Sequence, residues 1–410
     1  MNSRANQPLS ITDQLHYEKW KAVMDHPALH FFNWGVMHNC QYATIEPLAI
    51  SKELLTEIKT ATEACGKIYQ KAVDFALNSA QILRLLGIPE TAIEFCRLAY
   101  DPHMPVTVIG RFDFAVNGAG ENAEIKLLEF NSDTPTGVVE ASELNALITK
   151  LRHVKNPNEM FAGNVKKAFH QFISKKYENI IFTSLGWHQE DKGTVLAELA
   201  FSGLPAKYVP LDSIRVTADR VADDRGNRID LLYRLYPVEW FAREIDGIKL
   251  LELAAKSKLD LLNPPSAFVA QSKVMLAIIW ELYKNTHFFN KAEQEIITRY
   301  FLPVYLDNIY FKGRPHAVKP AFGREGGGVC LYDEQGEIEA LVENQEYIND
   351  LVYQERVTLP IHTISTWSGE FTGRLLVGSF LIGGEFSGVL LRVGEAITGD
   401  LAYFLPVTST

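Results

Sequence analysis

The sequence predicts a mixed α/β fold, in which a helical start leads into an α/β middle and a β-rich end. An apolar stripe at helical spacing runs through residues 50–86, and strand-like segments alternate with helix-like segments over 179–245. Beyond about residue 315 the segments are strand-like, with Gly-rich turns. The length of 410 residues predicts about two to three domains, and it allows large cores. A hydrophobic content of 47% is ordinary for a soluble globular protein.

The first strong element is one long helix over 50–86. Its apolar side chains recur in steps of four and three residues from Leu54 to Phe75, so they form one face that packs against other elements. Gly87 and Pro89 are expected to end it.

A β-hairpin is predicted next, with strands at 106–116 and 125–131, followed by a helix over 138–151. The alternation over 179–245 predicts parallel βαβ units, with strands at 179–186, 206–211 and 229–236 and helices at 194–203 and 237–245. An apolar helix is expected at 272–289. We therefore divide the chain into a helical segment (1–100), an α/β region for substrate and metal (101–270) and a nucleotide-binding region (271–410).

Charge and composition exclude several classes of protein. The formal net charge is −10, so the basic surplus of a general nucleic-acid binder is missing. The N-terminus lacks the apolar core of a signal peptide, and no apolar run reaches the length of a membrane span. We therefore expect a cytoplasmic protein. The four cysteines are far apart and lack zinc-binding spacing, so free, buried thiols are expected.

The polar face of the hairpin is the first candidate site. Alternation along the strands places Arg111 opposite Asn131 and Asp113 opposite Glu129. Facing carboxylates repel unless a cation lies between them, and carboxylate and amide oxygens are the ligands that Mg²⁺ prefers. The alternative is a solvated outer face with a chance Arg–Asp pair. Thr134 or Thr136 could cap the helix that follows, whose N-terminus would then attract phosphate or carboxylate.

The glycine-rich loop over 319–329 is the second candidate site. A strand brings in Lys319, and the loop contains Arg324 and four glycines, Gly323, Gly326, Gly327 and Gly328. Such a loop lets the backbone approach a ligand and offers N–H groups to phosphates, as a hairpin lid over a triphosphate would. It lacks the order of residues of a Walker A loop, and a plain turn is the alternative interpretation.

Four further residues are candidates. Lys273 opens the apolar helix, Arg392 lies in a strongly apolar strand where it needs a partner, and Gln354 and Glu355 could contact a base or ribose from a strand edge. For each one alone, an ordinary salt bridge or surface contact is the alternative.

Together these segments resemble the synthetase part of the glutathionylspermidine synthase family, an ATP-grasp group. The resemblance covers about residue 100 to the end and is closest to the stand-alone members. It is carried by RFDF (111–114), LLEFNSDTPTGVVEA (127–141), EDKGT (190–194), LYPVEWFARE (235–244), SKVMLAIIW (272–280), VKPAFGREGGGV (318–329), VYQERVTLP (352–360) and GVLLR (388–392).

The resemblance implies an ATP-grasp fold preceded by a parallel α/β (pre-ATP-grasp-like) domain. It also implies a ligase that uses ATP to phosphorylate a carboxylic acid, after which an amine attacks the acylphosphate. By the same resemblance Mg²⁺ would be held by Asp113, Glu129 and Asn131. Arg111 and Arg392 would stabilise the transferring phosphoryl group, and Lys273 and Lys319 the ATP phosphates. Arg324 and the glycines would form the lid, and Gln354 and Glu355 the adenosine hinge.

Departures from the family pattern leave the substrates open. There is no room for the Cys/His amidase domain of bifunctional members, so no hydrolysis is expected, and the lysine that spermidine-using members place after the arginine matching Arg392 is absent. Thr134 and Thr136 match positions that touch the acid, and Glu190 and Asp191 could bind an amine such as a polyamine. Alternatives are a nucleotide-binding protein without turnover, acting as sensor or scaffold, and a simple kinase.

Overall fold

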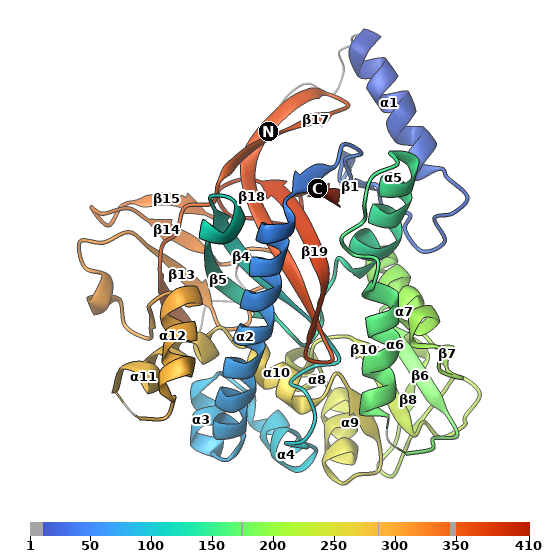
Figure 1. The fold of residues 1–410 in the computed structure, drawn as a ribbon. Coiled ribbons are helices and arrows are strands. Elements are labelled where there is room, and N and C mark those ends of the chain that lie inside the picture. Colours follow the sequence, from blue (N-terminus) through green and yellow to red (C-terminus); the bar gives the residue numbers. More distant parts are fainter. Residues whose placement is uncertain (1–10, 174, 286, 345–349) are drawn as a thin grey trace.

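The computed structural model describes residues 11–173, 175–285, 287–344 and 350–410. Its central antiparallel sheet has the strand order β20–β19–β18–β4–β5, and β17 pairs with the distal part of β18 (Figure 1). The sheet unites strands from the predicted middle and C-terminal regions, namely β4 (Ile109–Asn117), β5 (Glu124–Asn131), β17 (Ile361–Thr366), β18 (Gly369–Ile382), β19 (Glu385–Gly394) and β20 (Tyr403–Leu405).

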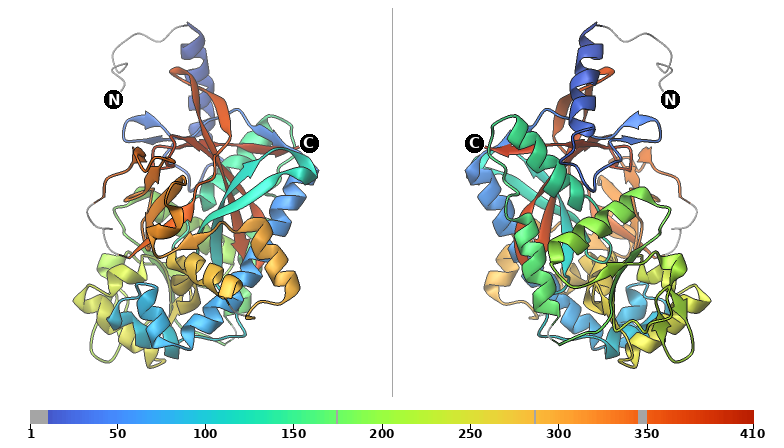
Figure 2. Two further views of the ribbon diagram at one scale, coloured as in Figure 1. Left: turned by 90° about the vertical axis from the view of Figure 1, so that its left-hand side faces the viewer. Right: turned by 90° about the vertical axis from the view of Figure 1, so that its right-hand side faces the viewer.

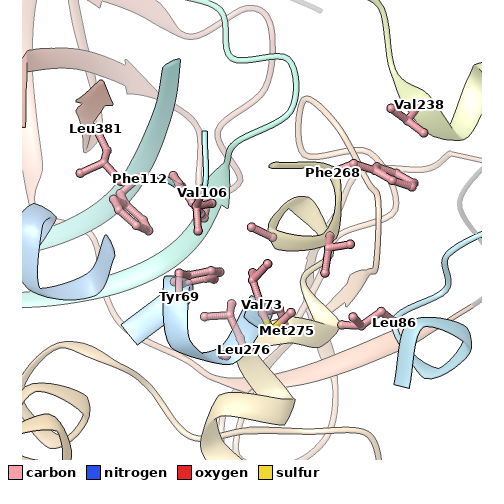
Figure 3. Packing of buried hydrophobic residues seen from close by; sticks show 14 of the residues in the cluster. Tyr69, Val73, Leu86, Val106, Phe112, Val238, Phe268, Met275, Leu276 and Leu381 are labelled. Carbon is pink, nitrogen blue, oxygen red and sulfur yellow. The ribbon is translucent and has the colours of Figure 1, made fainter. Parts of the chain in front are cut away.

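The predicted hairpin is confirmed down to its register. Arg111 pairs with Asn131 and Asp113 with Glu129, and a bulge follows Asp113. The opposite, apolar face of the hairpin carries Phe112 and Phe130, whose rings stack at 3.9 Å. Tyr69 of helix α2 (Lys52–Leu77) packs on both rings, as Figure 3 shows for Phe112. Burial of this face against α2 fixes which side chains of the hairpin point away from the core.

A second antiparallel sheet, of order β12–β16–β13–β14–β15, lies on the left in Figure 1. The glycine-rich loop joins β13 to β14, which pair as a hairpin, as predicted. The strands are β12 (Val304–Tyr305), β13 (His316–Pro320), β14 (Cys330–Tyr332), β15 (Ile338–Leu341) and β16 (Leu351–Glu355), with helices α10 (Pro265–Gln271), α11 (Val274–Asn285) and α12 (Lys291–Tyr300) before them.

The third sheet is parallel, in the order β11–β10–β6–β7, which confirms the predicted βαβ units (Figure 2). Its strands, β6 (Ile180–Ser184), β7 (Lys207–Tyr208), β10 (Leu231–Leu235) and β11 (Asp260–Leu262), are accompanied by helices α6 (Phe161–Phe172), α7 (Gln189–Ser202), α8 (Val238–Phe241) and α9 (Ile245–Ala255).

Shorter elements complete the fold. Strand β3 (Leu48–Ile50) pairs in parallel with the C-terminal β21 (Val407–Ser409), so the C-terminal strand is held by the segment that leads into α2. The others are α1 (Ile11–Met24), β1 (Val36–Met37), β2 (Cys40–Gln41), α3 (Ala80–Leu85), α4 (Glu90–Leu98), η1 (Gly120–Asn122), η2 (Glu140–Leu144), α5 (Asn145–Leu151), η3 (Leu211–Ser213), β8 (Arg215–Val216), β9 (Val221–Ala222) and η4 (Asn308–Phe311). None of the helices in the described part of the chain has both the length and the apolar character to cross a membrane.

The structure divides one predicted helix into two, confirms another with shorter bounds and exposes one cysteine that was expected to be buried. The helix predicted over 50–86 is two helices, because Ser79 accepts a hydrogen bond from the backbone N–H of Ile82 and so starts α3 after α2 has ended. The helix predicted over 272–289 begins at Val274 and ends at Asn285. All four cysteines are free, as predicted, but Cys40 is exposed rather than buried.

Candidate active site between the two antiparallel sheets

Asp113 is the centre of a group of charged side chains on the polar face of the central sheet. Its Oδ1 lies 2.7 Å from Arg111 Nε, and its Oδ2 lies 3.1 Å from Arg392 Nη2 on β19. The side-chain amide of Asn131 donates to Asp113 Oδ2 at 3.2 Å. Asp113 is buried, so its charge has to be balanced by these neighbours. The partner that the sequence required for Arg392 is therefore Asp113.

Gly378 makes room for this arrangement. It lies on β18, opposite Asp113 in the register, between the strands that carry the two arginines. A Cβ atom at Gly378 would lie 2.8 Å from Cδ of Arg111, closer than side-chain carbons approach one another. The guanidinium group of Arg111 can therefore reach Asp113 only because this residue has no side chain.

Glu129 extends the group toward the second sheet. Its Oε2 lies 3.1 Å from Nζ of Lys273, and its Oε1 accepts a hydrogen bond from Asn131. Burial alone would raise the pKa of Glu129, but the charges of Lys273 and Lys319 outweigh it and hold that pKa well below its ordinary value. Lys319 itself donates to Oε1 of Gln354 at 2.6 Å. Burial lowers the pKa of Lys319 to about 8.

We call Arg111, Asp113, Glu129, Asn131, Lys273, Lys319 and Arg392 together the charged cluster. It contains four cations and two carboxylates, which leaves an excess of two positive charges. Two carboxylates and one amide supply hard oxygen donors of the kind that bind Mg²⁺, provided that the Asn131 amide turns its oxygen toward them. Among the described residues there is no group of three or more His, Cys, Asp and Glu side chains arranged to hold a metal. A metal site here would depend on the amide and on phosphate oxygens.

The glycine-rich loop contacts the same region. Arg324 donates to Glu239 Oε1 at 2.6 Å and to the hydroxyl of Thr134 at 2.7 Å. The carbonyl of Thr136 accepts from Arg111, and the carbonyl of Gly323 accepts from Lys273. The predicted capping role of Thr134 was wrong, because the helix begins only at Val138, and the Thr134 hydroxyl accepts from Arg324. Thr136 takes part through its backbone carbonyl, the acceptor for Arg111.

The loop after β5 is held by residues that sequence reasoning missed. Asp133 forms a bidentate ion pair with Arg234 of β10, and both side chains are completely buried. The side-chain oxygen of Gln271 accepts from the backbone N–H of Ser132 and Asp133, and Asn263 donates to the carbonyl of Asp133. A lone arginine in the apolar segment LLYRLY was the available signal for Arg234, and it is the same signal that pointed to Arg392.

A cleft opens beside the charged cluster, between the central and the second sheet. It is lined by Asp113, Glu129 and Arg392 from one sheet and by Lys319, Gln354 and Glu355 from the other. Gly326 of the loop also lines it and lies against Ile397 and Thr398. Glu355 forms an ion pair with Arg314 at 2.6 Å. Four of the nine predicted nucleotide-binding residues, Lys319, Gly326, Gln354 and Glu355, therefore share one cavity. The other five are not part of its lining, namely Lys273, Gly323, Arg324, Gly327 and Gly328.

Glu190 and Asp191 lie outside this cleft, in the first turn of α7. Burial, followed by the charges of Glu140 and Asp191, raises the pKa of Glu190 to about 8. Glu140 is completely buried and accepts hydrogen bonds from Trp34 and Tyr42 at 2.8 Å each, while its Oε2 lacks a partner among the described residues. Glu325 of the glycine-rich loop also interacts electrostatically with Asp191. These carboxylates form an acidic region distinct from the charged cluster.

Residues 13–409 match the sequence profile of the family described as "Glutathionylspermidine synthase preATP-grasp". The chain belongs to this family. The match includes nearly all of the described residues. The resemblance inferred from the motifs is thereby confirmed.

Two curated relatives and one solved structure are similar to this family member. A Haemophilus influenzae protein named "Putative acid--amine ligase" is 24% identical over 86% of this chain and 87% of its own length. Trypanothione synthetase of Crithidia fasciculata is 22% identical over 81% of this chain, which spans only 52% of that relative. A glutathione synthetase-like effector from Globodera pallida shares the fold, with a TM-score of 0.62 at 10% identity over 99% of this chain and 98% of its own. The family and the named relatives identify the chain as an enzyme of the C–N-bond-forming ligase class.

Proposed function

We propose that the protein is an ATP-dependent carboxylate–amine ligase that activates its acid as an acylphosphate. The observation that carries this proposal is the charged cluster, in which Asp113 and Glu129 face each other across a hairpin while four cations surround them. Phosphoryl transfer requires positioning and charge neutralisation more than covalent chemistry by the protein. An excess of positive charge at the wall of a cleft between two sheets meets that requirement.

Each part of the cleft has a role in this proposal. Lys273 and Lys319 hold the ATP phosphates, and Gln354 and Glu355 contact the adenosine from the edge of β16. The charged cluster also fits Mg²⁺, which Asp113, Glu129 and Asn131 would hold and which would neutralise phosphate charge when bound. Arg111 and Arg392 stabilise charge on the transferring phosphoryl group, because they approach Asp113 from β4 and β19.

The two substrates are assigned to two neighbouring regions of the site, since Arg324 contacts Thr134 and Glu325 interacts with Asp191. The acid lies by the loop with Thr134 and Thr136, close to Arg111. The amine, which is cationic before it reacts, lies by the acidic region, where Glu190 and Asp191 attract it. A small-molecule or short-peptide acid and an amine of the polyamine class fit these charges.

The test is the release of phosphate from Mg²⁺·ATP across a grid of acids and amines, with thiol peptides and polyamines included. We expect release that requires both an acid and an amine, together with an amide product identified by mass spectrometry. Formation of ADP with an acid alone, with the phosphoryl group recovered on that acid, would make the protein a kinase. If no pair supports release while ATP still raises the melting temperature, the protein binds nucleotide without turnover, as the missing lysine after Arg392 would allow.

A further inference from the structure

The second sheet has a cavity on the face that points away from the nucleotide cleft. Successive residues of the strands point alternately to the two faces of the sheet. On β13, His316 lines this cavity and Lys319 lines the cleft. On β16, Tyr353 lines this cavity and Gln354 lines the cleft. The cavity has a volume of about 690 Å³. That volume lies within the range of small-molecule sites, roughly 300–1,000 Å³. None of the roles assigned to the ligase uses this face.

Aromatic rings form one wall of the cavity. The rings of Phe311 and His316 lie 5.4 Å apart with an angle of 14° between their planes, and those of His316 and Tyr332 lie 4.9 Å apart with an angle of 6°. Three nearly parallel rings thus follow one another across the sheet. Tyr353 adds a fourth ring, tilted by 45° to that of His316. Such a wall favours a flat, π-bonded ligand over an aliphatic one.

Polar side chains surround the opening. Two turns supply them: Asp307, Asn308 and Lys312 precede β13, while Asp333 and Gln335 follow β14. The carboxylate of Asp333 accepts from the backbone N–H groups of Gln335 and Glu337, which keeps it at the rim. Acceptors, amide donors and the cations Lys312 and Arg314 therefore surround the aromatic wall, a combination that matches a heterocyclic base with its hydroxylated sugar.

We propose that this cavity is a second ligand site, which binds a purine nucleoside with its base against the aromatic wall and its ribose hydroxyls at the carboxylate rim. It is separate from the nucleotide cleft and does not depend on the ligase reaction. Because His316 and Lys319 lie on the same strand, a ligand bound here stiffens the strand that carries a nucleotide-binding lysine.

Calorimetric titration tests the site with adenosine and guanosine as probes, using the full chain whose cleft is saturated with a non-hydrolysable Mg²⁺·ATP analogue. With the cleft occupied, we still expect one equivalent of nucleoside to bind. Tyr332→Ala should weaken that binding by about tenfold or more. Ile338→Ala, an exposed change on the same sheet outside both cavities, is the matched control and should bind as the wild type does. Absence of nucleoside binding with the cleft filled would overturn the proposal.

A crossed experiment separates the two sites. Gln354→Ala, which removes a proposed adenosine contact of the cleft, should weaken binding of the ATP analogue and leave nucleoside binding unchanged, whereas weakening of both would assign nucleoside binding to the cleft and overturn the proposal. Circular dichroism checks that each variant is folded. If Tyr332→Ala fails to fold, Lys312→Glu at the exposed rim replaces it, and unchanged binding in that variant would likewise contradict the site.

Discussion

Asp133 and Arg234 form a bidentate ion pair in which neither side chain has any exposed surface. Asp133 belongs to the loop that follows β5, and Arg234 belongs to the parallel sheet. The pair therefore fixes the loop with Thr134 and Thr136 against a different sheet from the one that carries the charged cluster. The position of the proposed acid site therefore depends on this ion pair, which is not itself part of the charged cluster.

Arg234→Met should destabilise the protein strongly, because it leaves the Asp133 carboxylate buried without its partner. We expect a loss of about 3–5 kcal/mol in the free energy of unfolding, measured by urea denaturation. The double variant Asp133→Asn with Arg234→Met should recover part of that loss. Lys249→Met breaks the exposed pair with Asp246 and serves as the control, with an expected change of about 1 kcal/mol or less. Equal effects for the two single variants would contradict the structural role.

Glu129→Ala should abolish the use of Mg²⁺·ATP while the protein stays folded. The side chain of Glu129 is 27% exposed on the polar face, and Lys273 keeps the carbonyl of Gly323 as a partner. Loss of this one charge should lower turnover by roughly 10²–10³. Phosphate release measures the activity and thermal melting the fold, with Glu124→Ala, an exposed change on the same strand, as control. Unchanged turnover would remove the hairpin from the site.

The affinity for ATP should fall as the pH rises above 8. Burial lowers the pKa of Lys319 to about 8, so its ammonium group is charged below that pH and loses its proton above it. A bound phosphate favours the charged form, hence ATP binding takes up a proton above pH 8 and weakens by up to about tenfold per pH unit. Calorimetry between pH 7 and 9.5, in buffers of different ionisation enthalpy, measures both effects. Lys319→Arg should flatten the profile, and a profile unaffected by that change would exclude Lys319.

Glu239→Gln should loosen the glycine-rich loop. Glu239 holds Arg324 by a charge-assisted hydrogen bond of 2.6 Å, and Thr134 is the second partner of that guanidinium group. We expect trypsin to cleave after Arg324 faster by about fivefold or more, since proteolysis tracks local opening. ATP should protect the loop in the wild type. Asp246→Asn, remote from the loop, is the control. Equal cleavage rates in both variants would contradict the role of Glu239 in holding the loop.

Glu190→Gln should raise the KM for the amine by about tenfold, with the KM for ATP unchanged. Burial raises the pKa of Glu190 to about 8, so in the free protein the carboxyl group is mostly protonated at pH 7 and becomes charged as the pH rises. The amine KM of the wild type should therefore fall between pH 6 and 8, and the variant should lose that dependence. Steady-state kinetics measure it, with Gln189→Ala as the neighbouring control. An equal rise in the KM for the amine and the KM for ATP would contradict a specific role of Glu190 in amine binding.

The sequence was sufficient to predict the hairpin and its register. It was not sufficient to predict the remote residues that pack against the hairpin and pair with its charges. A strict alternation of polar and apolar residues, bounded by one turn, leaves a single register, so the pairing of Asp113 with Glu129 was predictable. The break after α2 was not predictable, because the apolar stripe continues on both sides of it. Only a local hydrogen bond, from the backbone N–H of Ile82 to the Ser79 hydroxyl, marks the start of the next helix. The partners of Arg392 and Arg234 come from segments far away in the sequence, the strand β4 and the loop after β5, and a pattern shows only that each arginine needs a partner. The division into domains stays a prediction, although the central sheet crosses the expected boundary near residue 270.

The central sheet also determines when the active site can exist during synthesis. Asp113 and Arg392 are separated by 279 positions, and β4 hydrogen-bonds directly to β18. A chain emerging from the ribosome would expose the edge of β4 and the carboxylate of Asp113 until β18 and β19 have been made. Pairing over such a separation is slow and leaves strand edges open to aggregation. The charged cluster therefore cannot be complete before β18 and β19 have been made, and a chain stopped before β18 would carry Asp113 without Arg392.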